Sequence, residues 1–223
     1  MDGNLKIAKQ ASGETLDYDF SNTWFNNAKP FWLNLFRNFH PSRVLEIGSF
    51  EGASTCFLVG EIASKRPLEI HCIDTWEGGI EHQEGGSFAT DMHSVQLRFN
   101  RNIEIAKSHA VHRLDLLIHQ NYSDSALARL LTEGKAGYFD FIYVDGSHVA
   151  PDVLCDAVLS FKLLRKDGII CFDDYYWSEA NLKEIDPIRC PKIAIDAFTN
   201  TFCRQLKVLP GGGTQLFCRK TVC

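Results

Sequence analysis

The sequence predicts an α/β fold: a doubly wound, mostly parallel sheet of seven strands that ends in an antiparallel C-terminal strand. Two observations predict this fold. From residue 43 onward, short apolar runs alternate with longer segments of helical period, and strands separated by helices of this length pair in parallel through right-handed crossovers. The chain then ends in two apolar runs joined by a Pro-Gly-Gly-Gly turn, a pattern typical of a β-hairpin.

The first 40 residues are expected to form a loose N-terminal arm and a helical cap, followed by the main domain over residues 41–223. Residues 1–20 are polar and carry no clear period. Pro30 suits a first helical turn. Apolar side chains then recur at helical spacing, as Trp32, Leu35, Phe36 and Phe39. We therefore expect an amphipathic helix over residues 22–39 that packs on the core, and its aromatic side chains are also candidates for lining a substrate cleft.

The remaining elements follow in alternation, and several of the strands end at Gly or Asp. The expected strands span residues 43–47, 68–73, 113–118, 139–144, 168–172, 204–209 and 214–220. The expected helices span residues 54–63, 93–106, 124–131, 151–164 and 191–200. The segment 77–88 is rich in Gly and charge and has no apolar period, so we expect a loop there, at the edge of the sheet where ligands bind in such folds. Whether this loop is a lid or only a solvated turn stays open.

The composition is that of a mildly acidic globular chain. Lys and Arg total 23 against 28 Asp and Glu, which gives a formal net charge of −5, and 45% of the residues are apolar. This balance excludes a disordered chain and disfavours a broad phosphate-binding surface for nucleic acid. No apolar stretch approaches the roughly 20 residues of a membrane span, and the first residues lack the basic start and apolar run of a signal peptide. We therefore expect a cytoplasmic protein that binds neither nucleic acid nor membrane.

Eight cysteines are spread evenly along the chain without a C-x-x-C pair. In a secreted protein they would suggest a disulfide scaffold, but no leader supports that compartment. We expect free and mostly buried thiols in a reducing compartment. Zinc binding is disfavoured because ligand pairs at finger-like spacing are missing.

A glycine loop follows the first strand, with the sequence Glu46-Ile47-Gly48-Ser49-Phe50-Glu51-Gly52-Ala53-Ser54. Gly48 and Gly52 permit a tight turn and a close approach of a ligand to the backbone, and the next helix offers unpaired N–H groups at its N-terminus. A dinucleotide fingerprint would need Gly at positions 50 and 53, which are Phe and Ala, so NAD and FAD are disfavoured. No G-K-[ST] element for a nucleotide triphosphate is present. The structural alternative is an ordinary strand-to-helix turn.

The E-x-G-x-x-x-G pattern of this loop resembles the first motif of class I S-adenosylmethionine-dependent methyltransferases. The resemblance extends by its rhythm over about residues 43–220 and implies the Rossmann-like methyltransferase fold, with the loop on the methionine part of the cofactor. Asp74, which ends the second strand, matches the acidic residue that binds the ribose hydroxyls, since a carboxylate can accept two hydrogen bonds from a vicinal diol. The residues that the resemblance assigns to the cofactor are Glu46, Gly48, Ser49, Gly52, Ser54, Asp74, Trp76, Ser123 and Asp145.

Two of these assignments have an equally good structural alternative. Ser123 follows the third strand, where the family commonly contacts adenine, but it is also a candidate N-cap of the next helix. Trp76 comes soon after Asp74 and either flanks the adenine or packs the loop.

Carboxylates and one histidine follow the fourth and fifth strands. The fourth strand leads into Val144-Asp145-Gly146-Ser147-His148 and the fifth into Phe172-Asp173-Asp174-Tyr175. Because these strands are neighbours in a doubly wound sheet, we expect the three carboxylates to converge. Close carboxylates raise one another's pKa unless a cation joins them. Oxygen ligands of this kind suit a hard divalent ion, with Mg²⁺ first and Ca²⁺ or Mn²⁺ next.

Within the methyltransferases, D-G-S-H after the fourth strand and D-D after the fifth resemble the metal-dependent macrocin-O-methyltransferase-like sugar O-methyltransferases. The stretch 190–198 resembles their following helix. By this resemblance Asp145, Asp173 and Asp174 bind the metal, and His148 is the general base. Structural interpretations stand beside it: Asp-Gly is a common turn pair, Asp-Asp suits a solvated loop, and a single His beside a turn is often structural.

Together these features predict an enzyme that moves the methyl group of S-adenosylmethionine to a hydroxyl of a small molecule, a sugar or another polyol or phenol, with help from a divalent metal. The rivals are a metal-independent methyltransferase, a non-catalytic binding module that keeps the cofactor fold, and a dehydrogenase, which Phe50 and Ala53 disfavour. The fourth strand lacks the N-P-P-[YF] ending of nucleobase methyltransferases. The acceptor and the oligomeric state, including a homo-oligomer, stay open. We expect acceptor specificity in the N-terminal helix, the loop 77–93 and residues 175–190.

Overall fold

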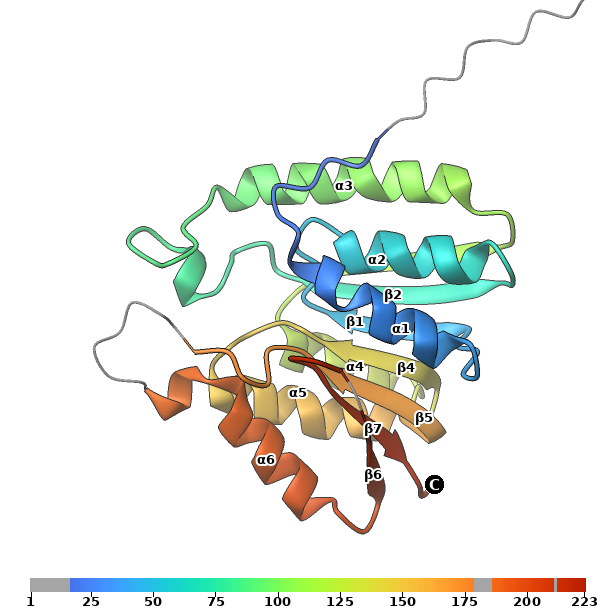
Figure 1. Ribbon diagram of the computed structural model, residues 1–223, viewed down its shortest axis with the longest axis vertical. Helices are drawn as coiled ribbons and strands as arrows, with labels where there is room; N and C mark the ends of the chain where they lie inside the picture. Colours follow the sequence, from blue (N-terminus) through green and yellow to red (C-terminus); the bar gives the residue numbers. More distant parts are fainter. Residues whose placement is uncertain (1–16, 179–185, 211) are drawn as a thin grey trace, which may run out of the picture.

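A single seven-stranded sheet organises the chain. The computed structural model describes residues 17–178, 186–210 and 212–223, and its strand order is β3-β2-β1-β4-β5-β7-β6 (Figure 1). The strands are β1 (Arg43–Ile47), β2 (Leu68–Asp74), β3 (Leu114–Gln120), β4 (Phe139–Val144), β5 (Leu164–Phe172), β6 (Leu206–Leu209) and β7 (Leu216–Lys220). Strands β1 to β5 pair in parallel, and β7 is antiparallel to both β5 and β6. The predicted doubly wound, mostly parallel sheet with an antiparallel C-terminal strand is confirmed.

Strand β1 lies at the centre of the parallel part, between β2 and β4. The chain order reverses there, and in open α/β sheets ligands bind in the crevice at such a switch point. Ile47 is in register with Ile73 of β2 and Val144 of β4. The loops that follow these three strands therefore leave the sheet at one level and form one continuous edge.

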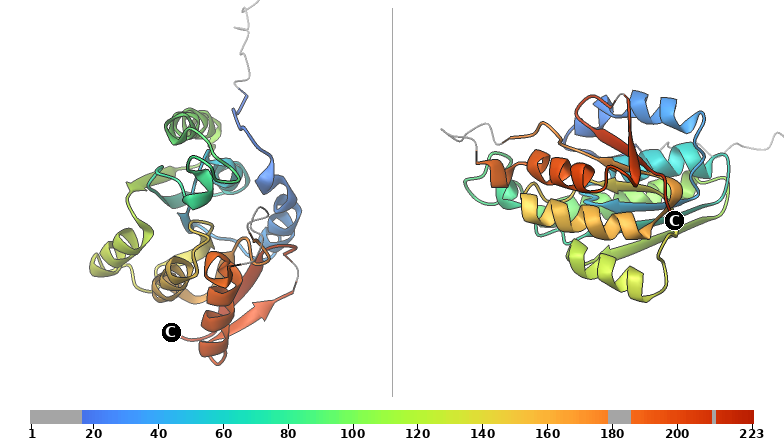
Figure 2. Two further views of the ribbon diagram at one scale, coloured as in Figure 1. Left: turned by 90° about the vertical axis from the view of Figure 1, so that its left-hand side faces the viewer. Right: turned by 90° about the horizontal axis from the view of Figure 1, so that it is seen from below.

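Helices cover both faces of the sheet (Figures 1 and 2). They are α1 (Lys29–Phe36), α2 (Ala53–Leu58), α3 (Met92–His109), α4 (Ser123–Thr132), α5 (Ala150–Leu163) and α6 (Pro191–Thr201). Residues of α1, α2 and α3 share one hydrophobic core, and residues of α4, α5 and α6 share the other. Because strand side chains alternate between faces, Phe141 and Tyr143 of β4 point into the first core and Ile142 and Val144 into the second.

The N-terminal segment is less helical than expected. The predicted helix over residues 22–39 is divided into a 3₁₀ turn, Trp24–Asn27, and the two-turn helix α1. Pro30 lies in the first turn of α1, as predicted, and Trp32 is fully buried against Phe141 and Tyr143. The helix therefore packs on the core, while the division of residues into a 1–40 arm and cap stays a prediction, because residues 1–16 lie outside the described residues.

The expected elements of the main domain are present, with bounds that differ by a few residues. The second predicted helix continues from α2 into a π-helical turn, Val59–Ala63, and the predicted loop 77–88 contains a 3₁₀ turn, Ile80–His82. A further 3₁₀ turn, Pro187–Arg189, precedes α6. None of the described helices is both long enough and apolar enough to cross a membrane.

The eight cysteines all lie in the described residues, and all are free. Four are buried, namely Cys56, Cys72, Cys171 and Cys218. The other four are exposed or half-buried, namely Cys155, Cys190, Cys203 and Cys223. The expectation of mostly buried thiols therefore holds for only half of them, because helix faces and chain ends carry the rest.

Candidate active site

A cavity of about 1090 Å³ opens at the carboxyl edge of the parallel strands. Its wall combines the loops after β1, β2, β3, β4 and β5 with the loop 78–82 and the N-terminal segment around α1. This volume lies at the upper end of the range for small-molecule sites and can hold a nucleoside-sized ligand together with a second molecule. Each residue predicted to bind a ligand can therefore be checked for whether it lines this cavity.

Gly48 stands where the glycine loop passes closest to β4. Its φ is +82°, and a Cβ atom placed on it would lie 1.9 Å from the carbonyl oxygen of Asp145. Only glycine combines this left-handed backbone with such an approach. Gly52 also has a φ of +82° but serves packing, because a Cβ there would lie 3.0 Å from the ring of Phe99. Gly48 is part of the cavity wall, whereas Gly52 lies behind it at the start of α2.

Glu46 fixes the glycine loop from inside the protein. Its carboxylate is fully buried and accepts hydrogen bonds from the hydroxyls of Ser49 at 2.7 Å, Ser54 at 2.6 Å and Thr55. Burial raises the pKa of Glu46 although these three donors act against it. Ser49 and Ser54 reach the cavity wall, and Glu46 does not. The predicted contact of Glu46 with the cofactor is therefore replaced by a positioning role.

Asp74 joins the ends of β1 and β2. Its Oδ2 accepts the backbone N–H groups of Ser49 and Phe50, each at 2.9 Å, and its Oδ1 accepts that of Trp76 at 2.7 Å. Burial raises the pKa of Asp74, while these backbone donors lower it. The side chain lines the cavity. Oδ2 already accepts two hydrogen bonds, so Oδ1 is the oxygen that can accept another from a ribose hydroxyl. For both hydroxyls of the ribose to donate to Asp74, as expected, the loop would have to rearrange.

Trp76 packs the loop and does not line the cavity. Its side chain is 6% exposed, its ring lies 4.8 Å from that of Phe99, and its Nε1 donates to the carbonyl oxygen of Phe50 at 2.9 Å. Both Phe50 and Trp76 hold left-handed backbone, with φ of +48° and +52°. In this structure the indole of Trp76 packs the turn, in line with the second alternative, and its contact with the adenine stays a prediction.

Ser123 lines the cavity as the first residue of α4. The N-cap position belongs to Tyr122, which makes no side-chain cap. The N-cap alternative for Ser123 is therefore excluded. Its hydroxyl instead lies near the carboxyl of Asp156 on α5, where it acts against the burial that raises the pKa of that carboxyl, and Asp156 also lines the cavity.

Asp145 and Asp173, at the ends of β4 and β5, contact the same phenol. The hydroxyl of Tyr143 lies 2.8 Å from Oδ2 of Asp145 and is also hydrogen-bonded to Oδ2 of Asp173. One hydroxyl proton cannot satisfy both carboxylates. Burial and then mutual repulsion raise the pKa of Asp145 well above its usual range, and burial and the charge of Asp174 raise that of Asp173. These two acids therefore compete for a proton or another positive charge.

A buried polar chain links this acidic pair to the N-terminal helix. Nε1 of Trp32 donates to Oε1 of Gln215 at 2.8 Å, and Nε2 of Gln215 donates to Oδ2 of Asp173 at 2.7 Å. Gln215 precedes β7 and is buried. The position of Asp173 thus depends on α1 and on the C-terminal hairpin as well as on β5.

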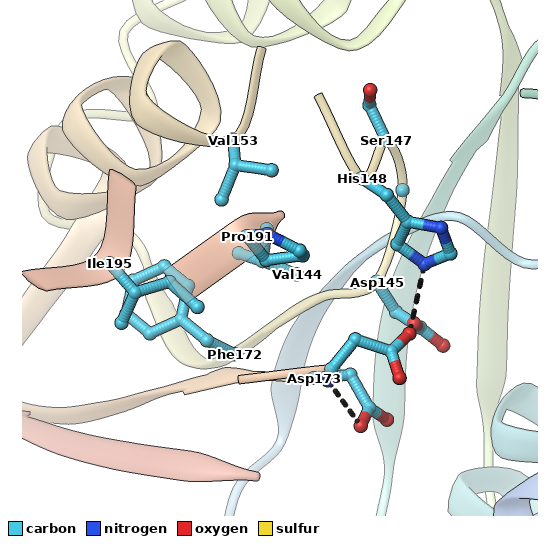
Figure 3. A pocket seen from close by; sticks show the side chains of 11 residues that line it. Val144, Asp145, Ser147, His148, Val153, Phe172, Asp173, Pro191 and Ile195 are labelled. Atoms are coloured by element: carbon cyan, nitrogen blue, oxygen red, sulfur yellow. Dashed lines mark hydrogen bonds and ion pairs between the residues drawn. The ribbon is translucent and has the colours of Figure 1, made fainter. Parts of the chain in front are cut away.

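Asp174 turns toward His148 rather than toward the other two acids. Figure 3 shows the imidazole of His148 beside these strand ends, next to a small pocket of about 10 Å³. Nε2 of His148 lies 2.9 Å from Oδ2 of Asp174, and its Nδ1 lies 3.2 Å from Oε1 of Glu81, which is buried in the loop 77–88. The ring stacks on Trp177, with centroids 4.0 Å apart. Asp174 holds a left-handed φ of +53°, a strain that is common at functional sites.

His148 is held between two negative charges. Burial lowers the pKa of His148, but the carboxylates of Asp174 and Glu81 outweigh burial and raise it to about 9. Burial likewise raises the pKa of Glu81, but the contact with His148 brings it down to about 2. The ion pair is therefore charged at neutral pH in the free protein. The imidazole must lose its proton before it can act as a general base.

The three carboxylates have suitable chemistry for a hard cation but do not surround one point. Within residues 17–178, 186–210 and 212–223 no three acidic, His or Cys side chains are arranged as one metal-binding group. The three acids converge on one pocket, as expected, but Asp174 is paired with His148, so they do not share one cation site in this arrangement. Asp145 and Asp173 do meet through the hydroxyl of Tyr143, and burial and like charge raise the pKa of both.

Aromatic side chains from two distant segments form the outer wall. Trp24 packs on Phe50 at 5.5 Å and on Phe88 at 5.6 Å between ring centroids, and Phe50 packs on His82 at 5.4 Å. The N-terminal aromatics that line the cavity are Phe20, Trp24, Phe25 and Phe31. Aromatics near the chain start do reach the cleft, as expected, but they differ from Trp32, which faces the core.

Several site residues were missed by the sequence prediction, namely Glu81, Tyr143, Asp156, Trp177 and Gln215. Tyr143 carried a signal, since it is the one polar-tipped ring in the buried run Phe139–Val144 and directly precedes the Val-Asp-Gly turn. Glu81 and Gln215 carried none, because their partners lie more than 40 residues away along the chain.

Comparison with known proteins agrees with this architecture. Residues 45–175 match the model of a family described as a methyltransferase domain. The chain is 35% identical over 80 residues to the probable caffeoyl-CoA O-methyltransferase 3 of Dictyostelium discoideum, a match that covers 36% of this chain and only 30% of that relative.

Two solved structures are similar in fold. The O-methyltransferase TomG from Streptomyces achromogenes, in complex with S-adenosylmethionine, has a TM-score of 0.58 at 18% identity, with 88% of this chain and 80% of that chain covered. The O-methyltransferase from Bacillus cereus, in complex with S-adenosylhomocysteine, has a TM-score of 0.58 at 18% identity, with 92% and 84% covered. At these identities the likeness concerns the fold.

Proposed function

The chain belongs to the methyltransferase domain family, and we propose that this S-adenosylmethionine-dependent methyltransferase acts on a hydroxyl oxygen of a small molecule with the help of a divalent cation. One observation carries the proposal: a single cavity of about 1090 Å³ brings the glycine loop and Asp74 together with Asp145, His148 and Asp173. The first group suits a nucleoside with an amino-acid tail, and the second suits activation of a hydroxyl.

The cofactor would lie along the wall formed by the ends of β1, β2 and β3. Gly48 and Ser49 offer backbone at the switch point and line the cavity. Asp74 offers Oδ1 to a ribose hydroxyl, and Ser123 lies farther along the same wall. Glu46 and Trp76 support this surface from behind. The bound cofactor supplies an activated methyl group on its sulfonium.

Catalysis then requires the chain to orient the acceptor and remove its proton. An alcohol is a poor nucleophile at neutral pH, so placing its oxygen in line with the methyl group contributes much of the rate. His148 lies in the cavity wall with both ring nitrogens facing carboxylates. His148 would first have to release the proton it carries to solvent, which a cation held by Asp145, Asp173 and Asp174 would favour by lowering its pKa; its free ring nitrogen could then accept the proton of the acceptor hydroxyl.

Asp145, Asp173 and Asp174 would hold the cation, with Mg²⁺ as the first candidate. The support is the donor chemistry and the repulsion between Asp145 and Asp173, whose raised pKa values a cation would relieve. A bound divalent ion lowers the pKa of an oxygen that contacts it. Asp174 would have to exchange His148 for the cation, and its left-handed backbone lies at that junction.

The acceptor is proposed to be a sugar, another polyol or a phenol. The D-G-S-H and D-D motifs support the macrocin-type sugar subgroup. The aromatic wall of Trp24, Phe50 and Phe88 supports an acceptor with a flat apolar face, and the name of the Dictyostelium relative contains a caffeoyl group. The sugar and the phenol alternatives differ in which part of the acceptor the aromatic wall contacts. Measuring methyl transfer to a panel of sugars, polyols and phenols distinguishes them.

Calorimetry followed by turnover tests the proposal. Purified protein is titrated with S-adenosylhomocysteine up to millimolar concentration, and we expect a saturable isotherm. Methyl transfer is then measured on hydroxylated sugars, polyols and phenols, with Mg²⁺ or with EDTA, for the wild type and Asp174→Ala. Activity that needs Mg²⁺ and Asp174 supports the full proposal, and activity that survives both chelation and the substitution selects the metal-independent rival. Binding without transfer to any acceptor selects a non-catalytic module, and no binding overturns the proposal.

A further inference from the structure

The N-terminal segment 17–25 forms part of the cavity wall, although most of it has no regular secondary structure. Residues 17–23 form neither helix nor strand, and the first 3₁₀ turn begins at Trp24. In Figure 1 the segment runs from α3 down to α1. The side chains of the segment that line the large cavity are Phe20, Asn22, Trp24 and Phe25. Contacts other than backbone ladders must therefore hold this part of the wall in place.

A single buried amide holds the segment against α3. Asn102 of α3 is fully buried, and its Oδ1 accepts the backbone N–H of Asp19 at 2.8 Å, while its Nδ2 donates to the carbonyl oxygen of Asp19 at 2.9 Å. Nδ2 also donates to the backbone carbonyl oxygen of Glu51, in the glycine loop, at 2.9 Å. An amide NH₂ group has two hydrogens, and here both have an acceptor. Asn102 therefore binds the N-terminal segment and the glycine loop at the same time.

Glu51 makes the same link from the side of the glycine loop. The residue is 2% exposed and belongs to the cavity wall. Its Oε2 accepts the backbone N–H of Ser21 at 2.6 Å, and its Oε1 lies 3.1 Å from Nη1 of Arg98 on α3. A buried carboxylate is costly unless it is paired and hydrogen-bonded. The position of Glu51 thus depends on the N-terminal segment as well as on α3.

Glu51 is also tied to the part of the loop that lies next to Asp74. It follows Phe50, whose φ of +48° is left-handed. The backbone N–H groups of Ser49 and Phe50 both donate to Oδ2 of Asp74 at 2.9 Å. The ring of Phe50 packs on Trp24 of the segment, with centroids 5.5 Å apart. A displacement of the segment would therefore reach the backbone that the proposed cofactor contacts.

We propose that Asn102 and Glu51 are positioning residues that join the N-terminal segment to the glycine loop, so that cofactor binding and the ordering of this part of the wall are linked. This inference rests on the proposed function, which places the cofactor along the glycine loop. Linkage is reciprocal: if an ordered segment favours cofactor binding, the bound cofactor makes the segment harder to open by the same factor. A role confined to fold stability would leave the affinity for the cofactor unchanged in variants.

Hydrogen exchange followed by mass spectrometry tests the link from the ligand side, on the full chain with and without S-adenosylhomocysteine. In the wild type we expect the bound ligand to slow amide exchange in peptides spanning residues 17–25 by about fivefold or more. In Glu51→Gln an NH₂ group faces either the N–H of Ser21 or Arg98, so at equal ligand occupancy the slowing should shrink to about twofold or less. Glu104→Gln, at an exposed carboxylate of α3, is the matched control and should keep the slowing of the wild type.

Calorimetry tests the link from the side of the segment. S-adenosylhomocysteine is titrated into the wild type, Glu51→Gln, Asn102→Ala and Ser21→Pro. By reciprocity Kd should rise about fivefold or more in each of these variants, and it should stay within about a factor of two in Glu104→Gln. Ser21→Pro removes a backbone N–H at an exposed position, so it keeps the test decisive if Asn102→Ala does not fold.

Two results would overturn the assignment while leaving the proposed function intact. One is binding of S-adenosylhomocysteine to the wild type without slower exchange in residues 17–25. The other is a Kd equal to that of the wild type in Glu51→Gln and Ser21→Pro, even if both unfold at a lower temperature, because these contacts would then serve stability alone. Absence of any S-adenosylhomocysteine binding by the wild type would instead remove the proposed function, and this inference with it.

Discussion

The two halves of the cavity wall treat their buried acids in opposite ways. After β1 and β2, Glu46 and Asp74 each accept three hydrogen bonds from hydroxyls or backbone N–H groups of the chain itself. After β4 and β5, Asp173 also accepts three hydrogen bonds, but it shares the hydroxyl of Tyr143 with Asp145, and like charge adds to burial in raising the pKa of both. In the first half, donors of the chain itself surround both carboxylates, whereas in the second half Asp145 and Asp173 repel each other and the cation of His148 pairs with Asp174 and Glu81 instead. Under the proposed function, the first half would hold the cofactor and the second would change its charge state during the reaction.

The largest expected effect tests how rigid the first half is. Gly48→Ala would force a methyl group to within 1.9 Å of the carbonyl oxygen of Asp145 and hold it at a φ of +82°. We expect this variant to lose more than about 3 kcal/mol of unfolding free energy, or to fail to fold. Urea unfolding followed by circular dichroism measures it. Gly60→Ala is the matched control, since nothing lies within 4 Å of its added Cβ, and it should be neutral or slightly stabilising. Equal stability of the two variants would show that the loop is not locked onto β4.

The next effect concerns the chemistry of the second half. His148→Gln removes the proposed base while keeping a polar side chain of similar reach, and we expect turnover to fall roughly 10²- to 10⁴-fold. Binding of S-adenosylhomocysteine should change little, because the glycine loop and Asp74 are untouched. His112→Gln, at an exposed histidine, serves as the control. Turnover within a factor of two of the wild type would remove His148 from the reaction.

A pair of isosteric substitutions tests the comparison itself. Glu46→Gln leaves one of three buried hydroxyls facing an NH₂ group, so we expect a loss of about 1–3 kcal/mol of unfolding free energy. Asp173→Asn also turns an NH₂ group toward Gln215 or toward the backbone N–H of Asp174, but it removes one of two repelling charges, so we expect a smaller loss of stability than for Glu46→Gln. Urea unfolding at neutral pH in EDTA measures both. If both variants lost stability equally, the carboxylates of the second half would be as well satisfied as those of the first.

The same two halves differ in how far the sequence could predict them. The contacts of the first half are short in sequence, since Glu46 binds side chains three, eight and nine residues away. A motif of nine residues therefore holds most of that geometry, and the prediction of Gly48, Ser49, Ser54 and Asp74 in one wall matches the arrangement found. Trp76 was the exception, because its burial depends on Phe99 of α3, which the motif does not contain.

In the second half the strand ends were predicted, but the pairings were not. Sheet order and period place Asp145 and Asp173 together, as expected. His148, which pairs with Asp174, also pairs with Glu81, a residue 67 positions earlier in the chain. Asp173 is held by Gln215, which in turn binds Trp32, 183 residues away along the chain. Such partners cannot be read from local spacing. The fold could be predicted from the alternation of strands and helices, whereas the pairing of the charged side chains could be seen only from tertiary contacts.

The smallest expected effect concerns the link between the loop 77–88 and the second half. Glu81 lies 3.2 Å from Nδ1 of His148 and helps to raise the pKa of the imidazole to about 9, against about 6.5 in an unfolded chain. Since the folded protein binds this proton more tightly, the ion pair stabilises the fold fully below about pH 6.5, and the stabilisation is lost as pH rises through about 9. Glu81→Gln removes one of the two carboxylates that hold the proton.

We therefore expect the difference in unfolding free energy between the wild type and Glu81→Gln to shrink by roughly 1 kcal/mol from pH 6 to pH 10. Urea unfolding at intervals of pH, in EDTA, measures this difference. Glu77→Gln, on the same loop but bonded to the exposed Tyr122, is the control and should show a flat difference. A difference for Glu81→Gln that stays flat or grows with pH would mean that His148 is not held as a cation by the loop. The loop would then lie beside the second half of the cavity wall without affecting the charge of His148.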